Sequence, residues 1–240
     1  MATTYNPRIV TNGLVLCLDA GNTKSYPGSG TTWTDISRNG NNGTLTNGPT
    51  FSSANKGSIV FDGVDDHIAF AWSESLNIGG RNLTLSAWIN SEELASAIQG
   101  EGIIVRENST LFPTYVARYE ILLLQSGNPA KNYAYFRIYN AAGLIGTKPL
   151  ELNTFYNITC VYRAGVQEIY VNGIFDTSSV GNIDITQSAT DVLRIGRRFV
   201  ALGDGAEFKG KIPFVCIYNR ALSASEVAQN FNATRGRYGV

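Results

Sequence analysis

The most constraining feature of the sequence is a run of alternating residues at 83–89, Leu-Thr-Leu-Ser-Ala-Trp-Ile. Successive side chains of a β-strand point to opposite sides of a sheet, so the odd-numbered apolar residues share one face. The even-numbered residues share the other face. A helix does not place every second residue on one side. The run therefore predicts a strand that buries one face in a core and has Trp88 near its end.

Runs rich in β-branched and aromatic residues recur along the chain and favour further strands. They cover residues 14–18, 58–61, 115–125, 133–139, 155–163, 166–171, 174–175, 192–195 and 211–218. Arg163-Ala164-Gly165 and Asn172-Gly173 predict hairpin turns between neighbouring strands. Because no helical segment bridges consecutive strands, the strands are expected to be antiparallel and to pack as two sheets.

The pattern changes near the C-terminal end. Ser223 and Glu226 have the spacing of a capping box, and Val227 and Phe231 fall on one helical face. We therefore expect an N-terminal arm over 1–12, a short helix over 223–231 and a loop-like tail over 232–240. A single domain over 1–240 is expected, because β-sandwiches of this length often form one unit and the Gly-rich stretches are short.

Charge and composition exclude several classes of partner. The 19 Lys and Arg residues balance the 19 Asp and Glu residues, so no electrostatic field attracts nucleic acid. Apolar runs of four or five residues are far shorter than the roughly 20 needed for a membrane span. The first ten residues lack the apolar stretch of a signal peptide. We expect neither a nucleic-acid partner nor a membrane partner.

Cys17, Cys160 and Cys216 lie far apart in apolar stretches, without the spacing of a zinc site. We interpret them as buried free thiols, with one disulfide plus a spare thiol as the alternative.

Three aspartates, Asp62, Asp65 and Asp66, cluster within five positions. Carboxylate oxygens suit calcium, but Asp and Gly also form ordinary turns, so both interpretations stay open and no cofactor is required. His67 is the only histidine, and a Ser-His-Asp arrangement with the neighbouring aspartates lacks the Gly-x-Ser-x-Gly nucleophile motif. We therefore assign no catalytic residue.

Glycoside hydrolysis needs two carboxylates at a short, defined separation. The acids embedded in predicted strands, Glu120 and Glu168, are isolated on separate strands. Sugar binding instead uses exposed aromatic faces with polar neighbours. Trp72, in a turn-like segment, and Tyr115 with Tyr119, on one strand face, are the candidate ligand-binding residues; core or rim packing is the alternative for each.

Several motifs occur in the order found in one family. They are the opening strand Gly13–Asp19, the Trp-x-Asp-x-Ser loop from Trp33 to Thr44, the strand Ser58–Gly63, the Phe-Asp-Gly-x-x-Asp stretch Phe61–Ile68, the alternating strand Leu83–Asn90, and the closing Tyr218–Ser223. On these residues the sequence resembles the concanavalin A-like, laminin-G-like jelly-roll superfamily over about 220 residues. The resemblance implies a jelly-roll β-sandwich, with Trp33 and Trp88 packed in the core.

One departure matters for function. The family usually has Ile-Asp-Glu-Val before its last strand, and this chain has Ile212-Pro213-Phe214-Val215. Two carboxylates are thus missing, which weakens any metal or polar-network role carried over from the resemblance.

The opening strand and the closing Tyr-Asn-Arg-Ala-Leu-Ser segment look most like laminin-G-like domains of tailed-phage structural proteins. The resemblance implies a non-catalytic virion module, assembled in the host cytoplasm as part of a capsid decoration, head fibre or tail fibre. Its partners would be other capsid or tail proteins and, in some settings, cell-surface glycans; a homo-oligomer stays open. A stand-alone lectin-like module is the alternative, and a glycoside hydrolase is the least favoured.

Overall fold

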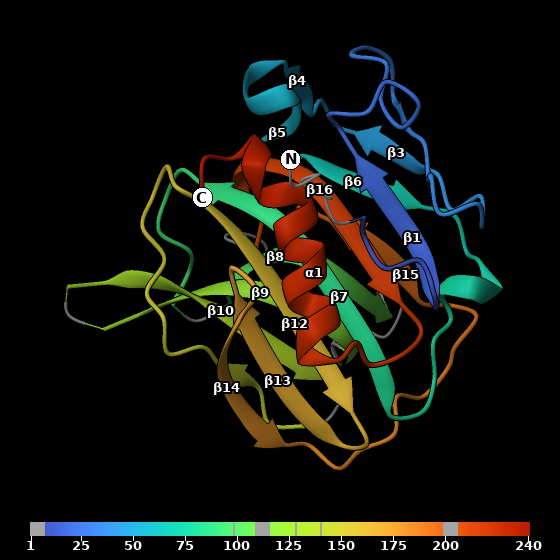
Figure 1. The fold of residues 1–240 in the computed structure, drawn as a ribbon, viewed down its shortest axis with the longest axis vertical. Coiled ribbons are helices and arrows are strands. Elements are labelled where there is room, and N and C mark those ends of the chain that lie inside the picture. Colours follow the sequence, from blue (N-terminus) through green and yellow to red (C-terminus); the bar gives the residue numbers. More distant parts are fainter. Residues whose placement is uncertain (1–7, 98, 109–115, 128, 140, 199–205) are drawn as a thin grey trace, which may run out of the picture.

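The computed structural model describes residues 8–97, 99–108, 116–127, 129–139, 141–198 and 206–240. In these residues two antiparallel sheets pack face to face, and one α-helix lies across the outer side of one sheet (Figure 1). The structure confirms the predicted all-β, antiparallel jelly-roll sandwich with one short C-terminal helix.

The first sheet, called sheet A, contains β1 (Leu14–Asp19), β4 (Thr50–Ser52), β5 (Ser58–Asp62), β7 (Asn82–Ser91), β12 (Phe155–Arg163), β13 (Val166–Val171), β14 (Ile174–Val180) and β16 (Lys209–Tyr218). Its order is β14-β13-β12-β7-β16-β5-β4, and β1 also pairs with β16. Both predicted hairpin turns are confirmed, because Val166 pairs with Arg163 and Ile174 pairs with Val171.

The second sheet, called sheet B, contains β2 (Thr32–Trp33), β3 (Gly43–Thr46), β6 (His67–Phe70), β8 (Glu101–Asn108), β9 (Val116–Ser126), β10 (Lys131–Ile138), β11 (Leu144–Ile145) and β15 (Val192–Ile195). Its order is β11-β10-β9-β8-β15-β6-β3-β2. Helical segments are η1 (Ala54–Lys56), η2 (Glu74–Leu76), α1 (Ala224–Thr234) and η3 (Arg235–Arg237). Helix α1, the longest described, is too short and too polar to cross a membrane.

Strand β7 lies in the middle of sheet A and confirms the alternating pattern. Its odd-numbered apolar residues from Leu83 to Ile89 belong to the core between the sheets. The opposite face is buried as well, because helix α1 covers it and Trp88 is fully buried there. The sandwich therefore has a second, smaller core on the outer side of sheet A.

The second core explains an error in the predicted tail, since residues 232–240 are not a loop. Helix α1 continues to Thr234, whose Oγ1 accepts a hydrogen bond of 2.8 Å from Trp88 Nε1. After η3, the ring of Tyr238 packs 4.3 Å from the ring of Trp88. Contacts with a tryptophan distant in sequence hold this segment, and no local pattern reveals them.

The start of helix α1 carries the predicted capping box. The amide of Glu226 donates to Ser223 Oγ at 3.3 Å, and Glu226 Oε2 accepts from the Ser223 amide at 2.8 Å. Arg220 donates to both carboxylate oxygens of Glu226, at 2.9 and 2.6 Å. The Arg220 guanidinium is the largest cause that lowers the pKa of Glu226 to about 2.

We expect Glu226→Gln to destabilise the protein by about 1 kcal/mol at pH 7, because it removes a bidentate ion pair that is only partly exposed. The pKa of Glu226 is lowered on folding, so this contribution is present above about pH 4.5 and is lost as the pH falls toward 2. Urea denaturation at pH 7 and pH 3 measures the difference. An equal loss at both pH values would contradict the ion-pair explanation.

The three cysteines are buried and free, as predicted. Cys17 and Cys216 are opposite each other on β1 and β16, with their sulfur atoms 3.4 Å apart. They fill space beneath helix α1, and burial raises the pKa of Cys160 and Cys216.

Candidate functional site

Two aromatic side chains are more than half exposed among the described residues, Trp72 at 51% and Phe175 at 53%. Phe175 lies on the edge strand β14 and packs edge-on against Tyr170. Trp72 follows the end of β6 and precedes η2, whose Leu76 is buried in the core. Trp72 is therefore an exposed ring held between a strand end and an anchored turn.

The loop that faces Trp72 is fixed by Asp35, which is 7% exposed. Its Oδ1 accepts hydrogen bonds from the amides of Cys17 and Ser37, at 2.9 and 2.8 Å. Its Oδ2 accepts from Ser37 Oγ at 2.8 Å and from the Asn41 amide at 3.0 Å. One carboxylate thus ties the loop before β3 to strand β1, and this is the physical role of the Asp in the Trp-x-Asp-x-Ser segment.

Two asparagines, Asn41 and Asn42, belong to the same loop and form the side of the site that faces Trp72. Asn41 Nδ2 donates to the carbonyl of Val15 at 2.7 Å and to Ser75 Oγ at 2.8 Å, which connects the loop to the segment after Trp72. Asn42 Oδ1 accepts from the Asp35 amide at 3.0 Å. The Nδ2 group of Asn42 has no partner among the described residues and is available to a ligand.

Together these loops form a pocket of about 250 Å³. It is lined by Asn39, Gly40, Asn41, Asn42, Ala71, Trp72 and Ser73. The lining offers one aromatic face, several amides and a hydroxyl, and it includes no charged side chain. Such a combination suits an uncharged ligand with an apolar face and several hydroxyl groups.

Two tyrosines were also predicted to bind a ligand. The prediction for Tyr119 is wrong, and Tyr115 lies outside the described residues. Tyr119 is fully buried, and its hydroxyl donates to the carbonyl of Leu76 at 3.1 Å. Burial raises its pKa to about 12. Ile121 and Leu123 share its face of β9 and its core cluster, so the strand turns Tyr119 toward the interior of the sandwich.

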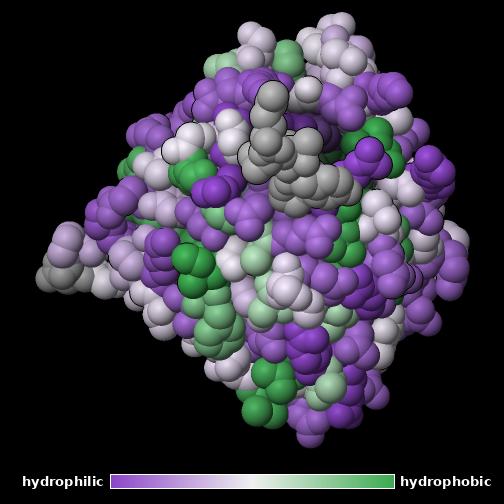
Figure 2. Space-filling model, viewed as in Figure 1, coloured by the Kyte–Doolittle hydropathy of each residue, from purple (hydrophilic) through white to green (hydrophobic). Residues whose placement is uncertain are grey.

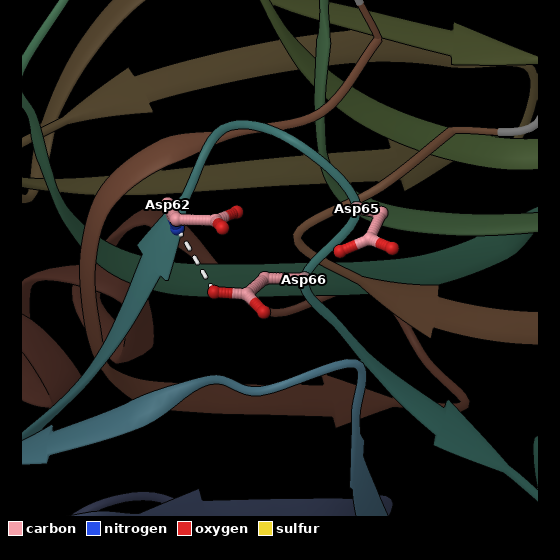
Figure 3. Close-up of side chains that lie close together, drawn as sticks. All are labelled: Asp62, Asp65 and Asp66. Carbon is pink, nitrogen blue, oxygen red and sulfur yellow. Dashed lines mark hydrogen bonds between the residues drawn. The ribbon is translucent and has the colours of Figure 1, made fainter.

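The three aspartates lie together at the turn between β5 and β6 (Figure 3). One oxygen from each of Asp62, Asp65 and Asp66 lies within 4.8 Å of the others. Asp62 is exposed, Asp65 is half-buried and Asp66 is buried. The spacing in the sequence therefore predicted a real cluster in space.

The histidine next to this turn does not form a catalytic arrangement. His67 Nδ1 is 3.0 Å from the carbonyl oxygen of Asp65, a backbone atom, and no described hydroxyl contacts the ring. Burial is the largest cause that lowers the pKa of His67. The ring lines the first position of β6, as a structural histidine does.

The two acidic residues expected within strands, Glu120 and Glu168, are separated from each other, as predicted. Glu120 lies on β9 of sheet B, where Arg137 pairs with it at 2.6 Å. Glu168 lies on β13 of sheet A, where Arg163 pairs with it at 3.2 Å. Each carboxylate is matched by a guanidinium, and the two belong to different sheets, so they cannot act as a pair on one glycosidic bond.

Glu101, at the start of β8, is an acidic residue with a shifted pKa that the sequence did not reveal. It is 3% exposed, and its Oε2 has no hydrogen-bond partner in the part of the chain that the structure describes. Burial raises its pKa to about 8, helped by the charges of Glu93 and Glu207. Glu101 is therefore enclosed by the chain and has no room for a sugar.

The resemblance carried by the sequence motifs agrees with a comparison of the whole chain with models of known families. The model of the concanavalin A-like lectin/glucanases superfamily matches residues 61–228, more than half of the chain. The chain belongs to this superfamily. A comparison with curated proteins finds no match.

Several solved structures share the fold of this superfamily member at low sequence identity. Domain 4 of AbnA, a GH43 extracellular arabinanase from Geobacillus stearothermophilus in complex with arabinotriose, has a TM-score of 0.65 and 17% identity; the match covers 90% of this chain and 97% of that domain. Trypanosoma rangeli sialidase in complex with sialic acid has a TM-score of 0.66 and 17% identity over 98% of this chain and 36% of the sialidase. The binding domain of Paraclostridial Mosquitocidal Protein 1 has a TM-score of 0.67 and 18% identity over 93% of this chain and 52% of that structure.

The closing motif of this superfamily member has a structural role. Tyr218 OH donates to the carbonyl of Val10 at 2.9 Å and accepts from Asn230 Nδ2 at 3.0 Å. Arg220 and Ser223 fix the start of helix α1. In the segment 212–215, which departs from the family's usual Ile-Asp-Glu-Val, the side chain of Phe214 lies in the second core.

Proposed function

We propose that this protein is a non-catalytic module that binds uncharged glycans through the Trp72 pocket. The observation that carries the proposal is an exposed indole that lines one pocket together with the exposed amide of Asn42. A sugar ring can stack its apolar face on the indole while one of its hydroxyls accepts a hydrogen bond from Asn42 Nδ2. The structures that share this fold include an arabinanase domain in complex with arabinotriose, which supports an uncharged carbohydrate ligand.

The surface also supports a small, local site. The face shown in Figure 2 is largely hydrophilic, and its hydrophobic residues form small, separate patches. Large apolar patches usually mark broad protein interfaces. A pocket with one aromatic wall is better suited to one or two sugar rings.

A glycan array with the intact protein identifies the ligand, and Trp72→Ala then tests the pocket. We expect this variant to bind the selected glycan at least about tenfold more weakly, because it loses the stacking surface. Phe175→Ala removes an equally exposed aromatic outside the pocket and should bind like the wild type. Equal losses in both variants, or no loss in Trp72→Ala, would refute this site.

The absence of catalysis is part of the proposal and has its own assay. Incubation with the bound glycan should release no reducing sugar, since the strand acids are paired with arginines and Glu101 is enclosed. Release of sugar that is lost in Glu101→Gln would favour the glycoside hydrolase alternative.

We further propose that the module is a structural component of a tailed-phage particle, in a capsid decoration, head fibre or tail fibre. This placement is supported by the resemblance of its opening strand and of Tyr218–Ser223 to such domains. Mass spectrometry of purified particles should find the protein with other capsid or tail proteins. Its absence from particles, with glycan binding intact, would favour a stand-alone lectin-like module.

A further inference from the structure

A second candidate site lies at the opposite end of β6 from Trp72. The carboxylates of Asp62, Asp65 and Asp66 extend into the turn between β5 and β6 from its two limbs (Figure 3). No ion pair among the described residues includes any of the three. The facing Lys209 pairs with Glu93 instead. The turn therefore concentrates negative charge without a cation from the protein.

Asp66 shows that this cluster is more than an exposed acidic turn. It is 4% exposed, and its Oδ2 accepts a hydrogen bond from the Asp62 amide at 3.0 Å. Its Oδ1 is buried and has no hydrogen-bond partner among the described residues. A buried carboxylate oxygen without a partner is costly, so native proteins normally give it a donor or a cation.

The structure points to a calcium ion: we propose that Asp62, Asp65 and Asp66 bind Ca²⁺ in the β5–β6 turn. The donors are all carboxylate oxygens, the ligands that hard cations prefer, whereas zinc sites use nitrogen and sulfur. Asp62 is exposed, so water can complete the six to eight oxygen ligands that calcium takes. Magnesium demands a more regular octahedron than one short turn supplies.

The surrounding contacts hold the turn in place for an ion. The Val64 amide donates to Asp62 Oδ1 at 2.8 Å, which leaves Asp62 Oδ2 for the metal. Asn47 Nδ2, from the turn after β3, donates to the Asp65 carbonyl at 3.2 Å. An ion bound here would thus connect the β5–β6 turn to the end of sheet B.

The competing explanation is a proton shared within the cluster. Burial is the largest cause that raises the pKa of Asp66, and the charges of Asp62 and Asp65 add to it. With a proton alone, stability would rise on acidification and would not respond to calcium. The two explanations therefore differ in a measurable way.

The test is calorimetric titration of CaCl₂ into chelator-treated protein, together with melting in EGTA or in CaCl₂. We expect one ion per chain and a melting temperature raised by about 5 °C at 100-fold excess over Kd. Asp66→Asn should weaken binding at least about tenfold, and Asp65→Asn, at a half-buried position, gives the same test if the first variant folds poorly. Asp184→Asn, whose side chain is 65% exposed, is the matched control and should bind like the wild type.

Loss of binding in the two site variants alone supports the proposal. Absence of heat and of a melting shift in the wild type at millimolar calcium overturns it, as does an equal response in Asp66→Asn. Stabilisation by acid without any calcium effect would replace it with the shared proton.

Discussion

Glu101→Gln should make the protein more stable than the wild type at alkaline pH, by as much as about 5 kcal/mol. Burial raises the pKa of Glu101 to about 8, against 4.5 for the free group. Because the folded state holds this proton more tightly than the unfolded state, wild-type stability falls as the pH rises from about 4.5 to about 8. Glutamine has the same shape and no charge, so it removes this slope.

Urea denaturation of both proteins between pH 5 and pH 9 measures the effect. Near pH 5 the two should agree within about 1 kcal/mol, since Glu101 is then protonated and resembles glutamine. Glu151→Gln, at a carboxylate whose side chain is 56% exposed, should keep the wild-type pH dependence. Parallel curves for Glu101→Gln and the wild type would show that Glu101 is ionised in the folded protein at neutral pH.

Asp35→Ala should destabilise the protein by about 3 to 5 kcal/mol and should also abolish binding in the Trp72 pocket. The substitution leaves the amides of Cys17, Ser37 and Asn41 without their acceptor. Each buried donor without a partner costs about 1 to 3 kcal/mol. Because the same carboxylate fixes the loop that carries Asn41 and Asn42, the pocket loses one wall.

Chemical denaturation and glycan binding, measured on the same samples, separate the two effects. Asp35→Asn keeps one acceptor oxygen, so its loss of stability should be intermediate. Asp184→Ala removes an exposed aspartate far along the chain and should change stability by less than about 1 kcal/mol. A well-folded Asp35→Ala variant with unchanged glycan affinity would contradict the role assigned to this loop.

The fold was predictable where local patterns agree with the environment. The alternation in β7 and the Asn172-Gly173 turn each need only neighbouring residues, and both were right. Strand β8 was missed because its charged residues hide the pattern. Glu107 is buried in an ion pair with Arg194 of β15, and a bulge between Gly102 and Ile104 of β8 interrupts the period of two.

The site was only half predictable for a related reason. Trp72 could be identified as a candidate from its turn-like neighbours, whereas its facing wall comes from Asn39–Asn42, some thirty positions earlier. The pairing of β3 with β6 and the hydrogen bond from Asn41 to Ser75 bring the two loops together. Tyr119 failed because its spacing from Tyr115 was considered without Ile121 and Leu123, which share its inward face.

Glycan binding at Trp72 can be followed through the indole N–H resonances of the three tryptophans. Trp33 and Trp88 are fully buried and serve as internal references, while Trp72 is exposed in the pocket. In a two-dimensional NMR titration with the glycan selected on the array, the Trp72 resonance should shift and saturate while the other two stay in place. A glycan that binds and saturates without moving the Trp72 resonance would contradict the proposed site.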